Sequence, residues 1–84
     1  MLYFIDYDLR KKRNYQPLYD ELKRFGAIPM LESLWCFRSN STAVAIRDHF
    51  AQFIDTDDGL SVSQVADWAT RGITNTPNKL ASAA

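Results

Sequence analysis

The sequence predicts an α+β domain in which an antiparallel sheet carries two helices on one of its faces. The prediction rests on a strand pattern at the N-terminus, on two segments whose apolar residues recur at helical spacing, and on further strand patterns between and after them. A chain of 84 residues is expected to form one domain with a single core, and a domain of this size gains from a partner.

Residues 1–9 (MLYFIDYDL) form the first predicted strand. Side chains alternate in direction along a strand, so Asp6 and Asp8 project from one face together with two apolar residues, while the residues between them project from the other. A basic cluster at residues 10–13 follows directly. This strand therefore places two carboxylates beside a group of cations.

The first helix is expected at about residues 15–25, where apolar side chains recur at helical spacing. Asn14 is a good N-cap, and Pro17 falls in the first turn, where a missing N–H is tolerated. Gly26 is the expected C-terminal stop.

Residues 27–38 are rich in apolar and aromatic side chains and predict β-structure. One long bent strand is the simpler interpretation, and the alternative is a pair of strands, Ala27–Met30 and Leu31–Arg38. Cys36 and Trp35 point to opposite faces in either case.

A second helix of about twelve residues is expected after the capping residues 39–41. Its apolar stripe consists of Ala43, Ile46, Phe50 and Phe53. Residues 55–59 have the composition of a turn, and residues 60–65 alternate as a strand. Trp68 to Ile73 adds a short fourth strand in this interpretation.

This order approximates the βαββαβ order of ferredoxin-like domains. Both helices are expected to cover one face of the sheet, and the strands also have large apolar groups on the opposite face. The sequence therefore predicts that the opposite face is buried in a homodimer. Residues 1–73 form the predicted domain, and residues 74–84 form a small, polar C-terminal tail that is flexible or exchanged between subunits.

Composition narrows the range of functions. Ten basic and ten acidic residues give a formal net charge of zero, so any binding of nucleic acid has to come from local patches. The single cysteine, Cys36, excludes an internal disulfide and a cysteine-based metal cluster, and it is interpreted as a core residue in a reducing compartment. No apolar run approaches the ~20 residues of a transmembrane helix, and no export signal is recognised, so a soluble cytoplasmic protein is predicted.

Three segments resemble a known superfamily. Residues 3–9 (YFIDYDL) resemble the first-strand signature of the small CRISPR-associated ferredoxin-like proteins, the second protein of the adaptation complex, and of their relatives in the virulence-associated protein D group. Residues 32–37 (ESLWCF) are similar to the second strand of that superfamily, and residues 54–62 (IDTDDGLSV) to its loop and strand of the form Asp-Xaa-Asp-Xaa-aliphatic. The similarity spans about residues 1–65.

The resemblance implies a homodimer whose two sheets pack face to face, with the two copies of Asp8 near the dimer axis. Some members of the superfamily are metal-dependent nucleases that cut RNA or DNA, and others are non-catalytic scaffolds that hold nucleic acid for an integrase. The polar tail of this chain departs from the long form of the family. An integrase partner, a stand-alone role and a toxin held inactive by an antitoxin therefore all remain open.

Asp8 is the candidate catalytic residue and metal ligand, because Mg²⁺ prefers oxygen ligands and can activate a bound water against a phosphodiester. Ser33 is expected to assist by hydrogen bonding. Tyr7 or Tyr15 would stack on a base. The candidate nucleic-acid-binding residues, which would contact phosphates, are Arg10, Lys11, Lys12 and Arg13. The alternatives are that Asp8 caps the following turn and that the basic cluster is a solvated loop.

Other polar and aromatic residues are given structural interpretations. Asp6 would need a partner such as Arg38 or a serine if it is buried. His49 lies beside the apolar stripe of the second helix, so a surface or boundary position is expected rather than acid–base catalysis. Trp35 and Trp68 are predicted to anchor the core or a dimer interface.

The sequence thus favours two functions. The first is a homodimeric, CRISPR-associated-like nuclease that depends on Mg²⁺ and cuts RNA or DNA, with Asp8 as the central residue. The second is a non-catalytic dimer that binds nucleic acid or protein, in which Asp8 is structural.

Overall fold

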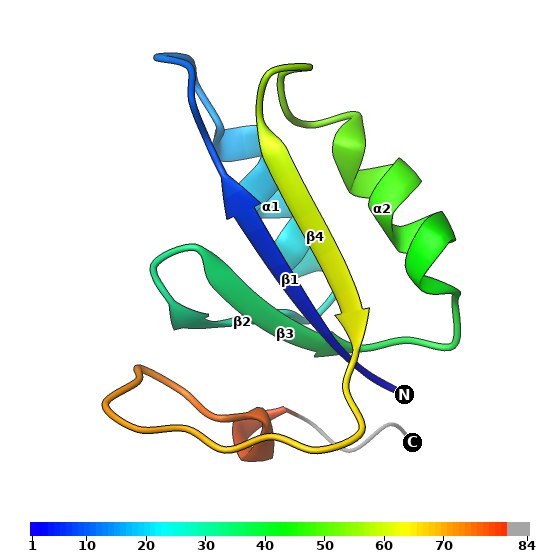
Figure 1. Ribbon diagram of the computed structural model, residues 1–84. Coiled ribbons are helices and arrows are strands. Elements are labelled where there is room, and N and C mark those ends of the chain that lie inside the picture. Colours follow the sequence, from blue (N-terminus) through cyan, green and yellow to red (C-terminus); the bar gives the residue numbers. More distant parts are fainter. Residues whose placement is uncertain (81–84) are drawn as a thin grey trace.

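A computed structural model gives the fold of the chain and describes residues 1–80 (Figure 1). Residues 81–84, the end of the predicted tail, lie outside the described residues. The elements in chain order are β1 (Leu2–Asp8), α1 (Gln16–Arg24), β2 (Ile28–Leu31), β3 (Leu34–Arg38), α2 (Ala43–Ala51), β4 (Gly59–Gln64) and the short 3₁₀ helix η1 (Pro77–Lys79).

The four strands form one antiparallel sheet in the order β2-β3-β1-β4. β1 lies between β3 and β4 and is antiparallel to both, and β2 pairs only with β3. Both helices pack on the same face of the sheet, because buried residues of each share one core with alternate residues of β1. Figure 1 shows α1 behind the sheet and α2 beside β4. This α+β arrangement is compatible with the ferredoxin-like fold that the sequence predicts.

The main core lies between the sheet and the two helices. β1 contributes alternate residues to it, beginning with Tyr3 and Ile5. Phe37 of β3 and Phe50 of α2 are also fully buried, with ring centroids 6.1 Å apart. The buried residues of this core are Tyr3, Ile5, Tyr7, Leu18, Leu22, Ala27, Trp35, Phe37, Ile46 and Phe50. The sheet face that they occupy is called the helix face below.

The opposite face of the sheet is called the second face. It carries Leu2, Phe4, Asp6 and Asp8 of β1, together with the residues that pair with them in β3 and β4. Its apolar residues Leu2 and Phe4 are half-buried, whereas Asp6 and Asp8 are exposed. The face therefore changes from apolar to acidic along a single strand.

Residues 27–38 form two strands, so the interpretation as one long bent strand is wrong. Leu31 pairs directly with Leu34, which leaves only Glu32 and Ser33 to make the connection. Neither of these two residues is the Gly, Asn or Pro that usually marks a tight turn. Cross-strand packing of this apolar segment decides the hairpin.

The predicted strand at Trp68 to Ile73 is also wrong, because these residues have no regular structure and β4 is the last strand. After β4 the chain crosses back to β2 (Figure 1). There the N–H of Thr74 donates to the carbonyl of Met30 (3.0 Å), and Asn75 Nδ2 donates to the carbonyl of Pro29 (2.9 Å).

This C-terminal segment, residues 65–80, covers part of the second face. Met30, Cys36 and Pro77 are buried, yet they do not belong to the main core. Cys36 pairs with Phe4 and therefore faces away from the helices. The burial of Pro77 shows that a segment without apolar periodicity nevertheless contributes to packing.

The helix ends differ slightly from the predictions. Gly26 has φ +74° just after α1, which confirms it as the stop, since this conformation favours glycine. Tyr15 occupies the N-cap position of α1, and Asn14 instead accepts the N–H of Gln16 through Oδ1 (2.9 Å). α2 has nine residues rather than about twelve, and its N-cap is Thr42.

None of the helices within residues 1–80 combines the length and apolar character that crossing a membrane requires.

Candidate functional site

Asp8 is the last residue of β1, and its side chain is 70 % exposed. Arg10 Nε lies 3.1 Å from Asp8 Oδ2 and forms an exposed ion pair with it. Ion pairs this exposed contribute little to stability. The Asp8 carboxylate is therefore open to a ligand that approaches the end of the strand.

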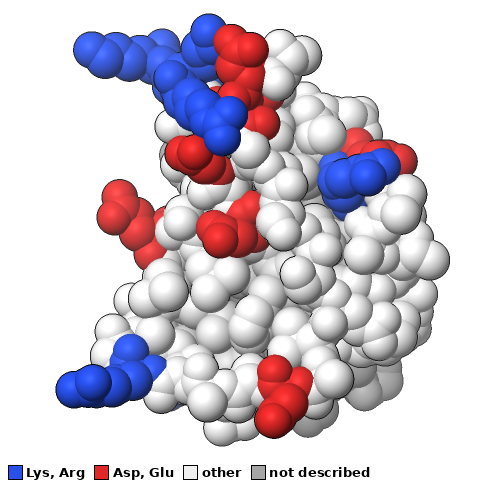
Figure 2. Space-filling view, in the orientation of Figure 1, with Lys and Arg blue, Asp and Glu red and all other residues white. Residues whose placement is uncertain are grey.

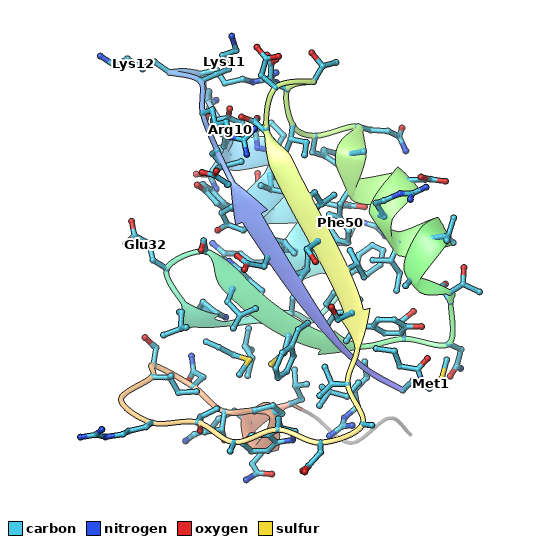
Figure 3. All side chains as sticks on the ribbon, viewed as in Figure 1. Met1, Arg10, Lys11, Lys12, Glu32 and Phe50 are labelled. Carbon is cyan, nitrogen blue, oxygen red and sulfur yellow. The ribbon has the colours of Figure 1, made fainter. Side chains whose placement is uncertain are left out.

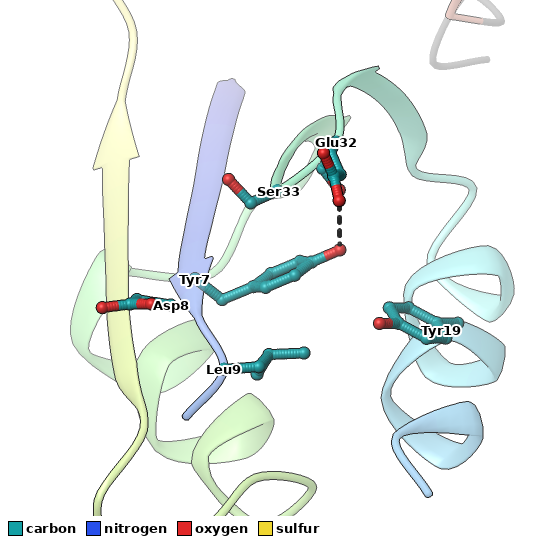
Figure 4. A pocket seen from close by; sticks show the side chains of 6 residues that line it. All are labelled: Tyr7, Asp8, Leu9, Tyr19, Glu32 and Ser33. Atoms are coloured by element: carbon teal, nitrogen blue, oxygen red, sulfur yellow. Dashed lines mark hydrogen bonds between the residues drawn. The ribbon is translucent and has the colours of Figure 1, made fainter. Parts of the chain in front are cut away.

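A cavity of about 340 Å³ opens beside Asp8 (Figure 4). Its lining residues are Tyr7, Asp8, Leu9, Tyr19, Glu32 and Ser33. They come from the end of β1, from α1 and from the β2–β3 turn. The structure thus places both predicted catalytic residues, Asp8 and Ser33, in the wall of one cavity.

Tyr7 fixes the β2–β3 turn against β1. Its hydroxyl donates to the backbone carbonyl of Glu32 (3.2 Å) (Figure 4). The same hydroxyl accepts from Trp35 Nε1 (3.0 Å). The backbone N–H of Tyr7 also donates to the carbonyl of Ser33 (3.1 Å). Burial is the main reason why the pKa of Tyr7 is raised above its ordinary value. Tyr7 therefore acts as a structural anchor.

Neither tyrosine proposed for base stacking offers a free ring. Tyr7 and Tyr15 are both only 7 % exposed. Their rings pack inside the fold, so stacking of a base on either of them is not available in this conformation. Tyr19 also lines the cavity and is half-buried, although its place in the apolar pattern of the first helix indicated only a core position.

A second hollow of about 210 Å³ lies on the other side of Asp8, between β1 and the start of β4. Asp6 lines it, is exposed, and accepts a hydrogen bond from Ser33 Oγ (3.3 Å). Asp6 is not buried, so it does not require the partner that the sequence would demand of a buried carboxylate, although Ser33 contacts it. Arg38 pairs with Leu2 at the opposite end of the strand, so it is not that partner.

The carboxylates near Asp8 suit a metal site with one or two protein ligands better than a site with three or more. No group of three or more His, Cys, Asp or Glu side chains that could hold a metal occurs within residues 1–80. Mg²⁺ commonly keeps several waters and takes only one or two protein carboxylates together with substrate phosphates. Asp8, with Asp6 on the same face, fits the arrangement with one or two carboxylates.

The basic loop at residues 10–13 is largely neutralised by the acidic loop before β4. Lys11 Nζ lies 2.7 Å from Asp57 Oδ2, and Arg13 Nη1 lies 3.7 Å from Asp55 Oδ2. Figure 2 shows basic and acidic side chains next to each other at this end of the molecule. The loop therefore presents little net charge to a phosphate.

Lys12 differs from its neighbours in the loop. It forms no ion pair with the part of the chain that the structure describes, and Figure 3 shows its side chain extending away from the body of the protein. Lys12 is therefore the basic residue of the cluster with the best access to a phosphate.

Asp58 is the residue that orders this end of the molecule. Its carboxylate accepts the backbone N–H groups of Arg10 (2.7 Å) and Asp55 (2.8 Å) and the hydroxyl of Tyr15 (2.6 Å). Burial acts to raise the pKa of Asp58, but these hydrogen bonds outweigh it and the pKa is lowered. Sequence reasoning placed Asp58 in a turn and missed this role, because its partners are up to 48 residues away.

The capping role suggested for Asp8 belongs to Asp58. Asp58 accepts backbone N–H groups from two loops, whereas the bond that the structure gives Asp8 comes from the side chain of Arg10. The carboxylate of Asp8 is thus left free of the structural task that would otherwise occupy it.

A separate polar cluster links the two helices away from this cavity. The carboxylate of Glu21 accepts two hydrogen bonds from the guanidinium of Arg24 (2.6 and 2.5 Å) and contacts His49 Nε2. The pKa of Glu21 is lowered to about 2, chiefly by the hydrogen bonds from Arg24. His49 is half-buried, as predicted, and does not line the cavity at Asp8.

Comparison of the chain with models of known protein families gives no match. Comparison with solved structures also gives no match.

Proposed function

We propose that the chain acts on nucleic acid as a homodimeric, Mg²⁺-dependent nuclease with Asp8 as its central residue. The observation that carries the proposal is the exposed Asp8 carboxylate between two hollows, one of which it shares with Ser33. The resemblance of residues 3–9 to the first strand of the CRISPR-associated and virulence-associated protein D proteins supports the same residue.

In this proposal four side chains take part in the reaction: two carboxylates, one hydroxyl and one guanidinium. When bound, Mg²⁺ would supply an activated water and charge neutralisation at the phosphate. Asp8, with Asp6 beside it, would hold the ion by its carboxylate oxygens. Ser33 donates to Asp6 and so keeps that carboxylate in place. Arg10, which lies against Asp8, would orient a phosphate oxygen.

Contacts with the rest of the nucleic acid would involve the basic loop. Lys12 is available for a phosphate without rearrangement. Lys11 and Arg13 would first have to separate from Asp57 and Asp55. Exposed ion pairs of this kind exchange partners at a cost of about 0–1 kcal/mol each, so a phosphate can compete for them.

The test is a cleavage assay on labelled RNA and DNA, with Mg²⁺ or with a chelator, using wild type and Asp8→Asn. We expect cleavage by wild type in Mg²⁺ and a loss of more than about 100-fold in Asp8→Asn, which exceeds the effect typical of residues outside the ligand set. Asp48→Asn, which removes another exposed carboxylate on α2, is the matched control and should cut like wild type. Equal traces of cleavage in wild type and Asp8→Asn would identify a contaminant and reject the nuclease.

A non-catalytic nucleic-acid-binding scaffold is the second candidate function. It is favoured by the ion pairs of Arg10, Lys11 and Arg13. Because these pairs neutralise most of the loop, few positive charges are left to stabilise the charge that develops on a phosphate during cleavage. Filter binding across a salt series would then show affinity that falls as salt rises, without cleavage. Lys12→Gln should weaken this binding, whereas Lys79→Gln on η1 should have less effect. Complete absence of binding at low salt would reject both candidates.

A further inference from the structure

The two outer strands of the sheet are protected very differently. On β2, Pro29 has no N–H to offer, and the register shifts between Pro29 and Leu31. The carbonyls of Pro29 and Met30 accept hydrogen bonds from the C-terminal segment. Proline, irregular register and a covering segment are the usual means of preventing an edge strand from pairing with another chain.

β4 has neither a proline nor a register shift, and the element beside it within residues 1–80 is α2, which packs against it from the helix face (Figure 1). Val65 donates its N–H to Leu2, so odd-numbered residues of this strand aim their backbone groups at β1. Backbone groups alternate in direction along an antiparallel ladder. The N–H and C=O groups of Leu60, Val62 and Gln64 must therefore point outward, along an edge with which no described strand pairs.

The composition of β4 also leaves it open to pairing. Its residues, GLSVSQ, include no charged side chain and no proline, and its ladder with β1 is regular. A hollow of about 300 Å³ lies where α2 and the acidic loop meet Leu60 of β4. An added strand would therefore find both backbone partners and space for a side chain beside the edge.

We propose that β4 pairs antiparallel with β4 of a second copy of this chain. The alignment that uses all the outward backbone groups places Val62 opposite Val62 of the second copy and Leu60 opposite Gln64. Ser61 then lies opposite Ser63 on the second face. This pairing brings no like charges together, and an apolar residue lies on the two-fold axis, so the strand is complementary to itself.

The inference rests on the homodimer of the proposed function, and it gives that dimer an edge-to-edge interface in place of the face-to-face packing that the resemblance implies. A two-fold axis at the β4 edge is perpendicular to the sheet, so the two sheets join into one. α1 and α2 of both copies then lie on one side, and the second faces of both copies, with Asp6 and Asp8, lie on the other. Each copy keeps its own Asp8 site on a shared surface, which nucleic acid can contact at two places.

Charge substitutions at Ser61 and Ser63 test the interface, because both side chains are exposed and neither packs in the core. Sedimentation equilibrium should show a concentration-dependent dimer for wild type. In Ser61→Lys/Ser63→Lys and in Ser61→Glu/Ser63→Glu, like charges would oppose each other across the axis, and we expect the dimer Kd to rise about tenfold or more. A mixture of the two variants should form a heterodimer. Thr70→Lys/Asn78→Lys, at exposed positions away from β4, is the matched control and should dimerise like wild type.

Restored association in the mixture supports the interface and also shows that both variants are folded. The inference is overturned if wild type is a monomer up to about 1 mM, in which case the edge would be available to a different partner. It is also overturned if each variant dimerises like wild type, or if the mixture shows no gain. Cleavage by wild type and by Asp8→Asn, both with unchanged Ser61 and Ser63, reports separately on the proposed function, because Ser61 lines the hollow beside Asp8.

Discussion

The two faces of the sheet are built from the same strands but serve different purposes. On the helix face, β1 contributes Tyr3, Ile5 and Tyr7 to a closed aromatic core. On the second face, the intervening residues of β1 run from half-buried Leu2 to exposed Asp8. Residues 65–80 cover the part of this face next to β2 and leave the acidic end open.

This difference separates stability from the candidate function. The core of the helix face can be kept intact while the carboxylates of the second face are changed, because strand alternation isolates the two sets of side chains. Substitutions on the helix face should therefore affect the free energy of unfolding, and those at the acidic end should affect binding or cleavage. Cleavage by Asp8→Asn tests the acidic end, and substitutions at Phe50, Asn75 and Glu21 test the contributions to stability, from the largest expected effect to the smallest.

Phe50→Ala should have the largest effect. Phe50 is fully buried in α2, and its ring contacts those of Phe25 and Phe37, with centroids 4.9 and 6.1 Å away. Truncation leaves a cavity in the aromatic core, and we expect the free energy of unfolding to fall by about 3–5 kcal/mol. Urea denaturation followed by circular dichroism measures it.

Val44→Ala is the control for Phe50→Ala, since Val44 lies on the same helix and is 57 % exposed. The urea concentration at which Val44→Ala is half unfolded should stay close to that of wild type. A loss below about 1 kcal/mol in Phe50→Ala would show that the helix face does not dominate stability.

Asn75→Ala should have an intermediate effect, confined to the second face. The substitution removes the hydrogen bond from Asn75 to the carbonyl of Pro29. We expect the C-terminal segment to lose about 0.5–1.5 kcal/mol of local stability, with a smaller change in global unfolding. Cys36 reports this opening, because it is fully buried on that face and burial raises the pKa of its thiol to about 11.

Alkylation of Cys36 under native conditions should become about two- to tenfold faster in Asn75→Ala than in wild type, which corresponds to the expected loss of local stability. Asn78→Ala, an exposed neighbour in η1, should react at the wild-type rate. If all three proteins react only as fast as they unfold globally, the segment is an inseparable part of the fold.

Glu21→Gln should have the smallest effect, and one that depends on pH. Glu21 has its pKa lowered to about 2 in the folded protein, from 4.5, mainly by Arg24. A lowered pKa means that the ionised carboxylate stabilises the fold above about pH 4.5 and that this contribution is lost as the pH falls toward 2. Between about pH 4.5 and pH 2, the melting temperature of wild type should therefore fall further than that of Glu21→Gln.

Lys23→Gln is the control for the pH experiment, because it changes an exposed charge on α1 without removing the carboxylate. Its melting temperature should fall with acid as that of wild type does. Parallel profiles for wild type and Glu21→Gln would contradict a stabilising role of the contacts between Glu21, Arg24 and His49.

Much of the fold follows from local sequence. The alternation in residues 2–8, the helical spacing that begins near Tyr15, and the stop at Gly26 each reflect neighbours in the chain. The hairpin at Glu32 and Ser33 did not follow, because its turn lacks the residues that usually mark one. The strand predicted at Trp68 is wrong for a different reason: residues 68–73 pair with no strand, and the segment is joined to β2 through Thr74 and Asn75.

The candidate site was predicted only in part. Asp8 and Ser33 were singled out, and the fold brings both to one cavity. The pairing of the basic loop with the acidic loop was missed, as was the role of Asp58. Charges in a sequence indicate that ion pairs will form, but the choice of partners depends on distances that only the folded chain sets.

The sequence by itself determined the α+β class, the direction in which Asp8 points and the near-zero net charge of the chain. Periodicity and composition suffice for these features because they are properties of adjacent residues. The tertiary structure decided which face the C-terminal segment covers, which basic residues are neutralised and which sheet edge stays open. These depend on contacts between segments far apart in the chain, where many alternative pairings have similar local energies and packing of the whole domain selects one.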